Sequence, residues 1–266
     1  MSTDVELLSD DVVEAYLARI GLRLDEITVD HDGLALLQYS HLVSVPFTNL
    51  DVFEREPVST ALEWSLPAVI QGRGGWCFVL NGAFASLLRS LGFDVTIYGA
   101  LVTMGGTGDI SPMDDHMCLR VDLDESWLVD VGFGESFTRP LALANDEPVF
   151  DAAAGRRFRL TTLEKGRRQL ESEQAEGTGT AWRDDYAFEE VGRDLAYFTP
   201  ANDYLANNPD LPWTQKRFST VLTESGRTTV LADRVKFSPV GTAEYVETID
   251  DAAWEAARRR YTPTPG

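Results

Sequence analysis

The spacing of apolar residues predicts that the chain is helical up to about residue 93. Apolar positions three and four residues apart indicate a helix that Ser9 caps and that Gly21 ends. Further helices are expected over residues 34–43 and over residues 77–91, where the apolar positions form one face. The first part of the chain is therefore predicted to be a helical domain.

From residue 94 onward, the pattern changes to the alternation that is typical of β-strands. A strand is expected over residues 94–104, followed by a Gly-rich loop over 105–115. Two hairpins are expected, 116–123 with 127–133 and 158–163 with 168–172. The rest is expected to comprise a loop over 176–181, a Pro/Asn-rich loop from Tyr197, strands over 219–222 and 227–237, and a helix over 249–260. Helices, then strands, then a mixed tail predict an α+β fold.

Composition and charge argue against several classes of protein. The chain has 266 residues, 44% of them hydrophobic, and no apolar run approaches the ~20 residues that span a bilayer. The acidic N-terminus does not resemble a signal peptide, so we expect a cytoplasmic protein with Cys77 and Cys118 as free thiols. A net charge of −20 argues against nucleic acid or membrane partners. Small-molecule partners remain, and the oligomeric state is left open.

Cys77 is the first candidate for chemistry. It follows Arg73-Gly74-Gly75-Trp76 and begins a predicted helix, where unpaired N–H groups and the helix dipole favour a thiolate. The two glycines allow the backbone to approach closely in front of the sulfur. A cysteine at a helix start can also be a small buried apolar residue, so this position alone does not establish catalysis.

His116 and Asp130 are the candidates for a base and its partner. His116 opens a strand after the Gly-rich loop, and Asp130 lies among apolar neighbours that leave a carboxylate in need of a partner. Both face one side of a hairpin if the connecting loop has an odd number of residues, and a loop over 123–125 meets that condition. Cys118 shares that face and is interpreted as a packed thiol. We expect a Cys-His-Asp triad of Cys77, His116 and Asp130.

The candidate triad lies within longer sequence blocks. They are Arg73-Gly74-Gly75-Trp76-Cys77-Phe78 with the helix after it, Val45-Pro46-Phe47-Thr48-Asn49-Leu50, His116, Asp130-Val131-Gly132-Phe133-Gly134, Phe198-x-Pro200-x-Asn202-x-Tyr204 and Gly226-Arg227. Together these blocks resemble the arylamine N-acetyltransferase family, and the resemblance covers most of the chain. Gly226-Arg227 is a weak signal, whereas the nucleophile block followed by His116 and Asp130 is a specific one.

The resemblance implies a helical domain over residues 1–93, a β-barrel domain over 94–195 and an α/β lid over 196–266. It implies ping-pong transfer of an acetyl group from acetyl-CoA, through a thioester on Cys77, to an arylamine or arylhydrazine nitrogen, without a metal. The family positions expected to contact the cofactor are Gly132, Phe133 and Gly134. Those expected to line the substrate pocket are Phe47, Phe133 and Tyr204.

Two positions depart from the family pattern. Thr48 stands where the family usually has Glu, which leaves Arg73 without its usual carboxylate unless Asp51 or Glu54 replaces it. Val79 stands where bacterial members often have Glu. Neither departure removes a triad member, so they affect the local support of the site more than the expected reaction.

Three other functions fit parts of the same pattern. Amide synthases that release a polyketide as a macrolactam resemble the family and keep the triad. A papain-like or transglutaminase-like hydrolase shares the triad logic but lacks these sequence blocks. A non-catalytic protein that binds a small molecule or CoA is suggested by Thr48 and Val79. Exposure to acetyl-CoA separates them, because only a transferase forms a thioester on Cys77 rapidly.

Overall fold

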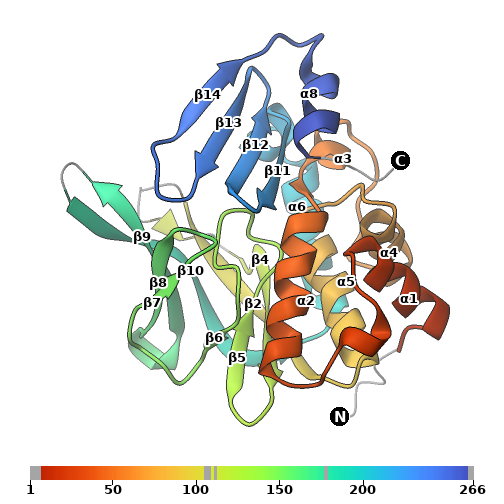
Figure 1. Ribbon diagram of the computed structural model, residues 1–266, viewed down its shortest axis with the longest axis vertical. Coiled ribbons are helices and arrows are strands. Elements are labelled where there is room, and N and C mark those ends of the chain that lie inside the picture. The colour runs from red at the N-terminus through yellow and green to blue at the C-terminus, as the bar shows by residue number, and fades with distance from the viewer. Residues whose placement is uncertain (1–6, 105–108, 111–112, 177–178, 263–266) are drawn as a thin grey trace.

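The computed structural model describes residues 7–104, 109–110, 113–176 and 179–262. Helices of the N-terminal region lie beside an antiparallel barrel, and a C-terminal sheet covers one end of both (Figure 1). This arrangement confirms the predicted α+β class. The boundaries at residues 93/94 and 195/196 remain a prediction.

The N-terminal region is built around one buried helix. Its helices are α1 (Asp10–Arg19), α2 (His31–Ser44), α3 (Leu50–Phe53), α4 (Leu62–Ile70) and α5 (Cys77–Ser90), with a short 3₁₀ helix over Leu24–Glu26. Every residue of α5 from Cys77 to Leu88 is buried. The one-sided apolar face predicted for this helix is therefore wrong, because α5 packs against α4 on one side and against the barrel strands on another.

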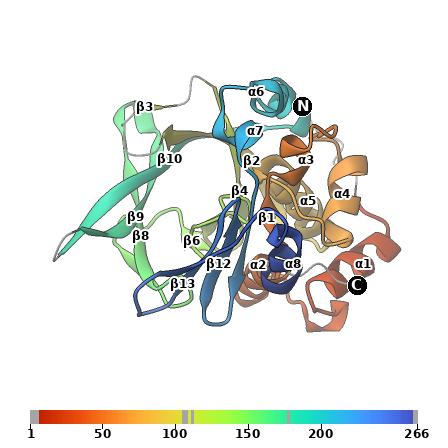
Figure 2. The ribbon, with the colours of Figure 1, turned by 90° about the horizontal axis from the view of Figure 1, so that it is seen from above.

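Eight strands curve into a near-closed antiparallel barrel (Figures 1 and 2). They are β2 (Asp94–Met104), β4 (His116–Asp122), β5 (Ser126–Val129), β6 (Leu141–Ala142), β7 (Val149–Asp151), β8 (Arg156–Thr162), β9 (Arg168–Glu176) and β10 (Gly179–Arg193). Their order is β6-β5-β4-β2-β10-β9-β8-β7, and β3 (Asp109–Ile110) pairs with β2. Buried aromatic and aliphatic side chains, among them Tyr98, Phe158 and Tyr186, fill the interior.

The C-terminal region combines a second sheet with short helices. Its elements are a 3₁₀ helix over Leu195–Phe198, α6 (Thr199–Asn207), α7 (Pro212–Gln215), β11 (Phe218–Thr223), β12 (Gly226–Leu231), β13 (Arg234–Pro239), β14 (Tyr245–Thr248) and α8 (Trp254–Tyr261). The strand β1 (Phe47–Thr48) pairs with β11 at the edge of this sheet. The strand that lies beside the nucleophile block, through the bridge from Phe47 to Gly75, is therefore also paired with the C-terminal sheet.

Several predicted elements need correction. The Pro/Asn-rich segment after Tyr197 contains α6 and α7, because a proline in the first turn of a helix costs no hydrogen bond. The run 227–237 is two strands, β12 and β13, and the terminal helix begins at Trp254, not at residue 249. The loop expected over 176–181 is largely strand; residues 177–178 lie outside the described residues, as do 105–108 and 111–112 of the Gly-rich loop.

Among the described helices, none has the length and apolar character needed to cross a membrane.

His41 is a buried neutral histidine of the helical core. Its Nδ1 lies 3.1 Å from the Tyr16 hydroxyl, and its ring packs edge-on against Phe84 at 5.2 Å between centroids. Burial lowers the pKa of His41 to about 3, and the charge of Arg19 adds to that shift. In the unfolded chain the same imidazole titrates near pH 6.5, so the unfolded state gains a proton that the folded state does not.

We expect the wild type to lose more stability in mild acid than a His41→Gln variant loses over the same change of pH. A depressed histidine pKa contributes stability above about pH 6.5 and loses it as the pH falls. Between pH 6.5 and 5 the free energy of unfolding should fall by about 1.5 kcal/mol more in the wild type than in the variant. Urea unfolding at both pH values measures this, and equal pH slopes would contradict it.

Candidate active site

Cys77 begins α5 at the point where a glycine turn passes along the Pro46–Thr48 segment. Gly74 has φ +76°, and a Cβ there would lie 2.1 Å from the carbonyl oxygen of Pro46. Next in the chain, Gly75 accepts a hydrogen bond from the backbone N–H of Thr48 at 3.0 Å. Only a glycine fits position 74 without strain or collision. The turn holds the thiol at the helix N-terminus, where Cys77 is 7% exposed.

The hairpin of β4 and β5 brings His116 and Asp130 together. Asp122 pairs with Ser126, so the connecting loop is residues 123–125, which confirms the predicted odd-numbered loop. Asp130 follows the last residue of β5, and its Oδ2 lies 2.7 Å from Nε2 of His116. The two residues are 2% and 1% exposed. A buried, charge-assisted hydrogen bond of this length orients the imidazole.

Asn81 holds the carboxylate from the opposite side. Its amide nitrogen donates to Asp130 Oδ1 at 2.9 Å and to the Met117 carbonyl at 2.6 Å, and its Oδ1 accepts from the Val131 N–H at 2.9 Å. The backbone N–H of Gly132 also donates to Asp130 Oδ1, at 2.8 Å. Sequence reasoning gave Asn81 no role in the site. The available signal was its spacing, because a residue four positions after Cys77 lies on the same side of the helix.

The Cys77 thiol lies close enough to His116 to interact with it electrostatically. Its Sγ also lies 3.7 Å from the Asp115 carbonyl oxygen. Burial alone would lower the pKa of His116, but the Asp130 charge and hydrogen bond, with a smaller contribution from Cys77, raise it to about 10. This balance favours an imidazolium at neutral pH. The arrangement therefore places a cationic imidazole beside the thiol of the candidate nucleophile.

Aromatic rings enclose the histidine. The Phe133 and Tyr186 rings lie 5.2 and 4.8 Å from the His116 ring, measured between centroids. Burial raises the pKa of the Tyr186 hydroxyl, and the neighbouring Asp130 charge raises it further. Cys118 is fully buried on the same hairpin, and burial likewise raises the pKa of its thiol. Tyr186 belongs to β10, a strand that the sequence analysis did not identify.

The other predicted site residues divide into two groups. Gly132 lies directly against the nucleophile, since a Cβ there would lie 2.7 Å from the Cys77 Cα, and a Cβ at Gly134 would lie 3.2 Å from the Phe47 ring. Phe47, Gly132, Phe133 and Gly134 are therefore brought together at the triad. Tyr204, by contrast, is 43% exposed on α6, and no contact described for it reaches the triad.

The C-terminal region contributes further aromatic side chains near Phe47. The Phe47 and Phe218 rings lie 5.6 Å apart, and Trp213 lies 5.8 Å from Phe218, measured between centroids. Asn49 holds the segment that carries Trp213 and Phe218. Its amide nitrogen donates to the carbonyl oxygens of Trp213 and Lys216, and its Oδ1 accepts from the Phe218 N–H. This aromatic group was not predicted because Phe47 lies far in the sequence from Trp213 and Phe218.

The structure shows what replaces the family's usual Glu at position 48. Asp51 carries the ion pair with Arg73, with Oδ2 3.9 Å from Nε, and burial raises the pKa of Asp51 while Arg73 opposes the shift. Thr48 instead donates its hydroxyl hydrogen to the Phe218 carbonyl oxygen at 2.8 Å. Of the two substitutes considered, Asp51 is therefore the partner of Arg73, and position 48 serves the joint between β1 and β11.

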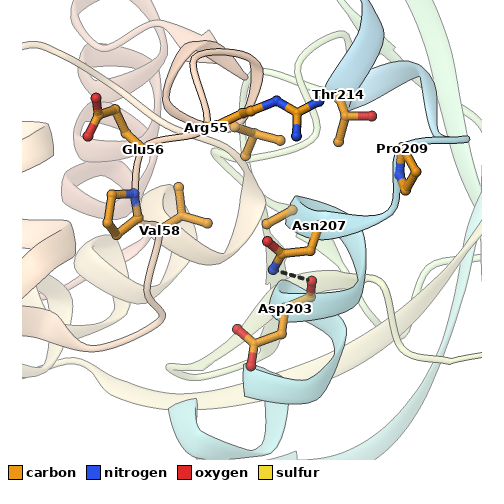
Figure 3. Close-up of a pocket in the computed structure, with 10 residues that line it drawn as sticks. Arg55, Glu56, Val58, Asp203, Asn207, Pro209 and Thr214 are labelled. Atoms are coloured by element: carbon orange, nitrogen blue, oxygen red, sulfur yellow. Dashed lines mark hydrogen bonds between the residues drawn. The ribbon is translucent and has the colours of Figure 1, made fainter.

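A separate pocket of about 330 Å³ lies between the segment after α3 and helices α6 and α7 (Figure 3). Arg55, Glu56 and Asp203 are among the side chains around it, and no triad residue lines it. Arg55 has φ +61°, an uncommon conformation for a residue with a side chain. The lining residues are mostly exposed, and half of them are apolar. Because none of them belongs to the triad, this pocket adds nothing to the chemistry at Cys77.

The chain is similar to known proteins over most of its length. A model of the N-acetyltransferase family matches residues 30–261. Proansamycin X synthase of Amycolatopsis mediterranei (strain S699) is 36% identical over 182 residues, which are 66% of each chain. Arylamine N-acetyltransferase 1 of Homo sapiens is 30% identical over 234 residues, covering 80% of this chain and 79% of the relative.

The same relationship is visible in three dimensions. The solved arylamine N-acetyltransferase of Mycobacterium abscessus superposes with a TM-score of 0.84 at 24% identity, covering 96% of this chain and 90% of that chain. The similarity in fold agrees with the family match and with the relatives found by sequence. The chain belongs to the arylamine N-acetyltransferase family.

Proposed function

We propose that this family member carries an acetyl group from acetyl-CoA on Cys77 and passes it to the nitrogen of an arylamine or arylhydrazine. The observation that carries the proposal is the buried hydrogen bond between His116 and Asp130, with the Cys77 thiol beside the same imidazole. A thiol at a helix start, a histidine beside it and a carboxylate behind the histidine are the parts that nucleophilic acyl transfer requires. Family membership supports acetyl-CoA as the donor.

In the first half-reaction His116 holds the proton of the Cys77 thiol, and the thiolate attacks the acetyl carbonyl carbon. The new C–S bond to Cys77 forms as the C–S bond to CoA breaks, and His116 gives the proton to the departing CoA thiolate. Asp130 stabilises the imidazolium that exists before this transfer. The first N–H groups of α5 have no acceptor inside the helix and can donate to the carbonyl oxygen as it becomes negative.

In the second half-reaction the amine nitrogen attacks the thioester carbon of acetyl-Cys77. A C–N bond forms as the C–S bond breaks, and the neutral His116 accepts the proton that leaves the nitrogen. The products are the amide and the original thiolate–imidazolium pair. A planar arylamine suits this site because Phe47, Phe133 and Phe218 offer aromatic faces and edges beside the triad.

The proposal is tested by intact-mass measurement after stoichiometric acetyl-CoA, followed by peptide mapping. We expect one acetyl group per chain, located on Cys77 and removed when an arylamine or arylhydrazine is added, with appearance of the N-acetyl product. Cys118→Ala should be acetylated like the wild type. A chain that stays unmodified would contradict the proposal and support a protein that only binds a small molecule.

An amide synthase is the second candidate, favoured by the 36% identity to proansamycin X synthase. Such an enzyme would use the same Cys77 chemistry, but the acyl group would be a polyketide chain and the acceptor an aryl nitrogen within that chain. A competition assay separates the two functions. Acyl thioesters of increasing chain length that carry a terminal aminoaryl group should give slower acylation than acetyl-CoA if the first proposal is right, and faster acylation with macrolactam release if the second is right.

A further inference from the structure

A small cavity lies between the barrel and the C-terminal sheet, close to the loop that follows the active-site glycines. Its volume is about 40 Å³, and its polar lining comes from the Glu135-Ser136 pair, from Arg156 at the start of β8 and from Arg227 and Ser238 of the C-terminal sheet. A cavity needs roughly 10–15 Å³ to hold one water molecule, so this one has room for a small ion with its contacts.

Positive charge is in excess around this cavity. Glu135 Oε1 lies 2.7 Å from Arg156 Nη2, and its Oε2 lies 3.9 Å from Lys236 Nζ. The three cations Arg156, Lys236 and Arg227 hold the pKa of Glu135 below its usual value, although burial opposes that shift. Lys236 has a second carboxylate partner, Glu244, at 2.9 Å. Glu135 is therefore shared by both arginines, and Arg156 also interacts electrostatically with Asp185.

Arg227 lies near Glu135 but makes no direct contact with a carboxylate among the described residues. Within the described part of the chain, its guanidinium makes no hydrogen bond and no ion pair. Burial lowers its pKa to about 10; Glu135 opposes the shift and the nearby Arg156 adds to it. A half-buried guanidinium next to another guanidinium is unfavourable unless negative charge lies between them.

Two further donors at the cavity are unused. Ser136 is 6% exposed, and its buried hydroxyl has no hydrogen-bond partner among the described residues. The Nε of Arg156 is buried without a partner as well. Buried polar groups are nearly always hydrogen-bonded, so a cavity lined by a free hydroxyl, a free Nε–H and a free guanidinium indicates a missing acceptor.

We propose that this cavity binds one small monovalent anion of the chloride class. The anion would accept from the Ser136 hydroxyl, from Arg156 Nε and from the Arg227 guanidinium. Water alone would satisfy the hydrogen bonds but would leave Arg227 with only the shared charge of Glu135 among its described neighbours. Because Ser136 lies two residues after Gly134, the anion would also tie the active-site loop to the C-terminal sheet.

The direct test is a crystal of the wild-type protein soaked in sodium bromide and measured at the bromine absorption edge. We expect an anomalous peak in the cavity between Ser136, Arg156 and Arg227. A cavity that contains only water in such a crystal, with no anomalous peak, would overturn the proposal. This measurement needs no variant, so it does not depend on whether a substituted chain folds.

The solution test compares thermal unfolding in sodium chloride and in sodium gluconate at equal ionic strength. The wild type should melt about 3–6 °C higher in chloride at a concentration ten times the Kd. Arg227→Met and Ser136→Ala should lose most of this chloride-specific difference. Arg234→Met, at an exposed arginine of the same sheet, should keep it. Equal melting temperatures of the wild type in the two salts, or an undiminished difference in both cavity variants, would overturn the proposal.

Discussion

Replacement of Cys77 by alanine should abolish acetyl transfer while leaving the fold intact. The thiol is the only group of the proposed triad that forms a covalent bond to the acetyl group, and an alanine has no atom that can replace it. Loss of a covalent nucleophile costs at least ~10⁴-fold in rate. The measurement is the rate of CoA release from acetyl-CoA in the presence of an arylamine, together with the melting temperature of the variant.

Cys118→Ala is the matched control for this experiment. Cys118 is fully buried on β4 and, as the other cysteine of the chain, has the same chemistry available to it. We expect Cys118→Ala to lose some stability, as small core substitutions do, and to keep most of its activity. If Cys77→Ala stays active and Cys118→Ala does not, the nucleophile has been assigned to the wrong cysteine.

The parts of the site that could be predicted from the sequence are those set by local rules. Cys77 lies at the start of α5 because a glycine turn precedes an apolar helix. His116 and Asp130 meet because they lie on one hairpin, whose register follows from a loop of three residues. Turn composition and strand alternation depend on near neighbours in the chain, and one sequence contains that information.

The parts that could not be predicted depend on packing between distant segments. The helix α5 looks amphipathic in sequence, but all of its residues from Cys77 to Leu88 are buried. The polar Asn81 is therefore not a surface residue and instead donates a hydrogen bond to Asp130. Tyr186 reaches His116 from β10, whose charged and polar residues conceal the strand pattern. The pairing of β1 with β11 brings Phe47 and Phe218 together, although they are 171 positions apart in the sequence.

Family resemblance and structure also contribute different information at position 48. The resemblance indicates that a carboxylate near Arg73 is missing from its usual position, and it leaves two substitutes. Only the three-dimensional arrangement distinguishes them, because Asp51 faces Arg73 from the first turn of α3. The carboxylate that pairs with Arg73 therefore lies at position 51, three residues after the position where the family usually has Glu.

Asp130→Asn should lower the rate of acetyl transfer by at least ~10²-fold, with the nucleophile still in place. The carboxylate is the main reason that the pKa of His116 is raised to about 10, because burial acts in the opposite direction. An asparagine supplies no charge to stabilise the imidazolium, and its amide group can favour the wrong tautomer. Alkylation of Cys77 by iodoacetamide at neutral pH should slow as well, because without the Asp130 charge His116 is a weaker base for the thiol proton.

For the same variant we also predict a pH-dependent change in stability, whose sign follows from the raised pKa of His116. A histidine with a raised pKa in the folded state stabilises the fold fully below about pH 6.5, and it loses that contribution as the pH rises to about 10. The difference in unfolding free energy between wild type and Asp130→Asn should therefore be largest near pH 6 and shrink towards pH 10. Urea unfolding across this range measures it.

Asp151→Asn is the control that separates charge at the triad from loss of any buried carboxylate. Asp151 is 1% exposed and accepts hydrogen bonds from the Thr138 hydroxyl and from the backbone of Ala153 and Ala154, with no histidine in contact. Its replacement should cost stability without the pH-dependent difference and without slower alkylation of Cys77. If the two variants slow alkylation equally, Asp130 acts only by supporting the fold, and its place in the triad is wrong.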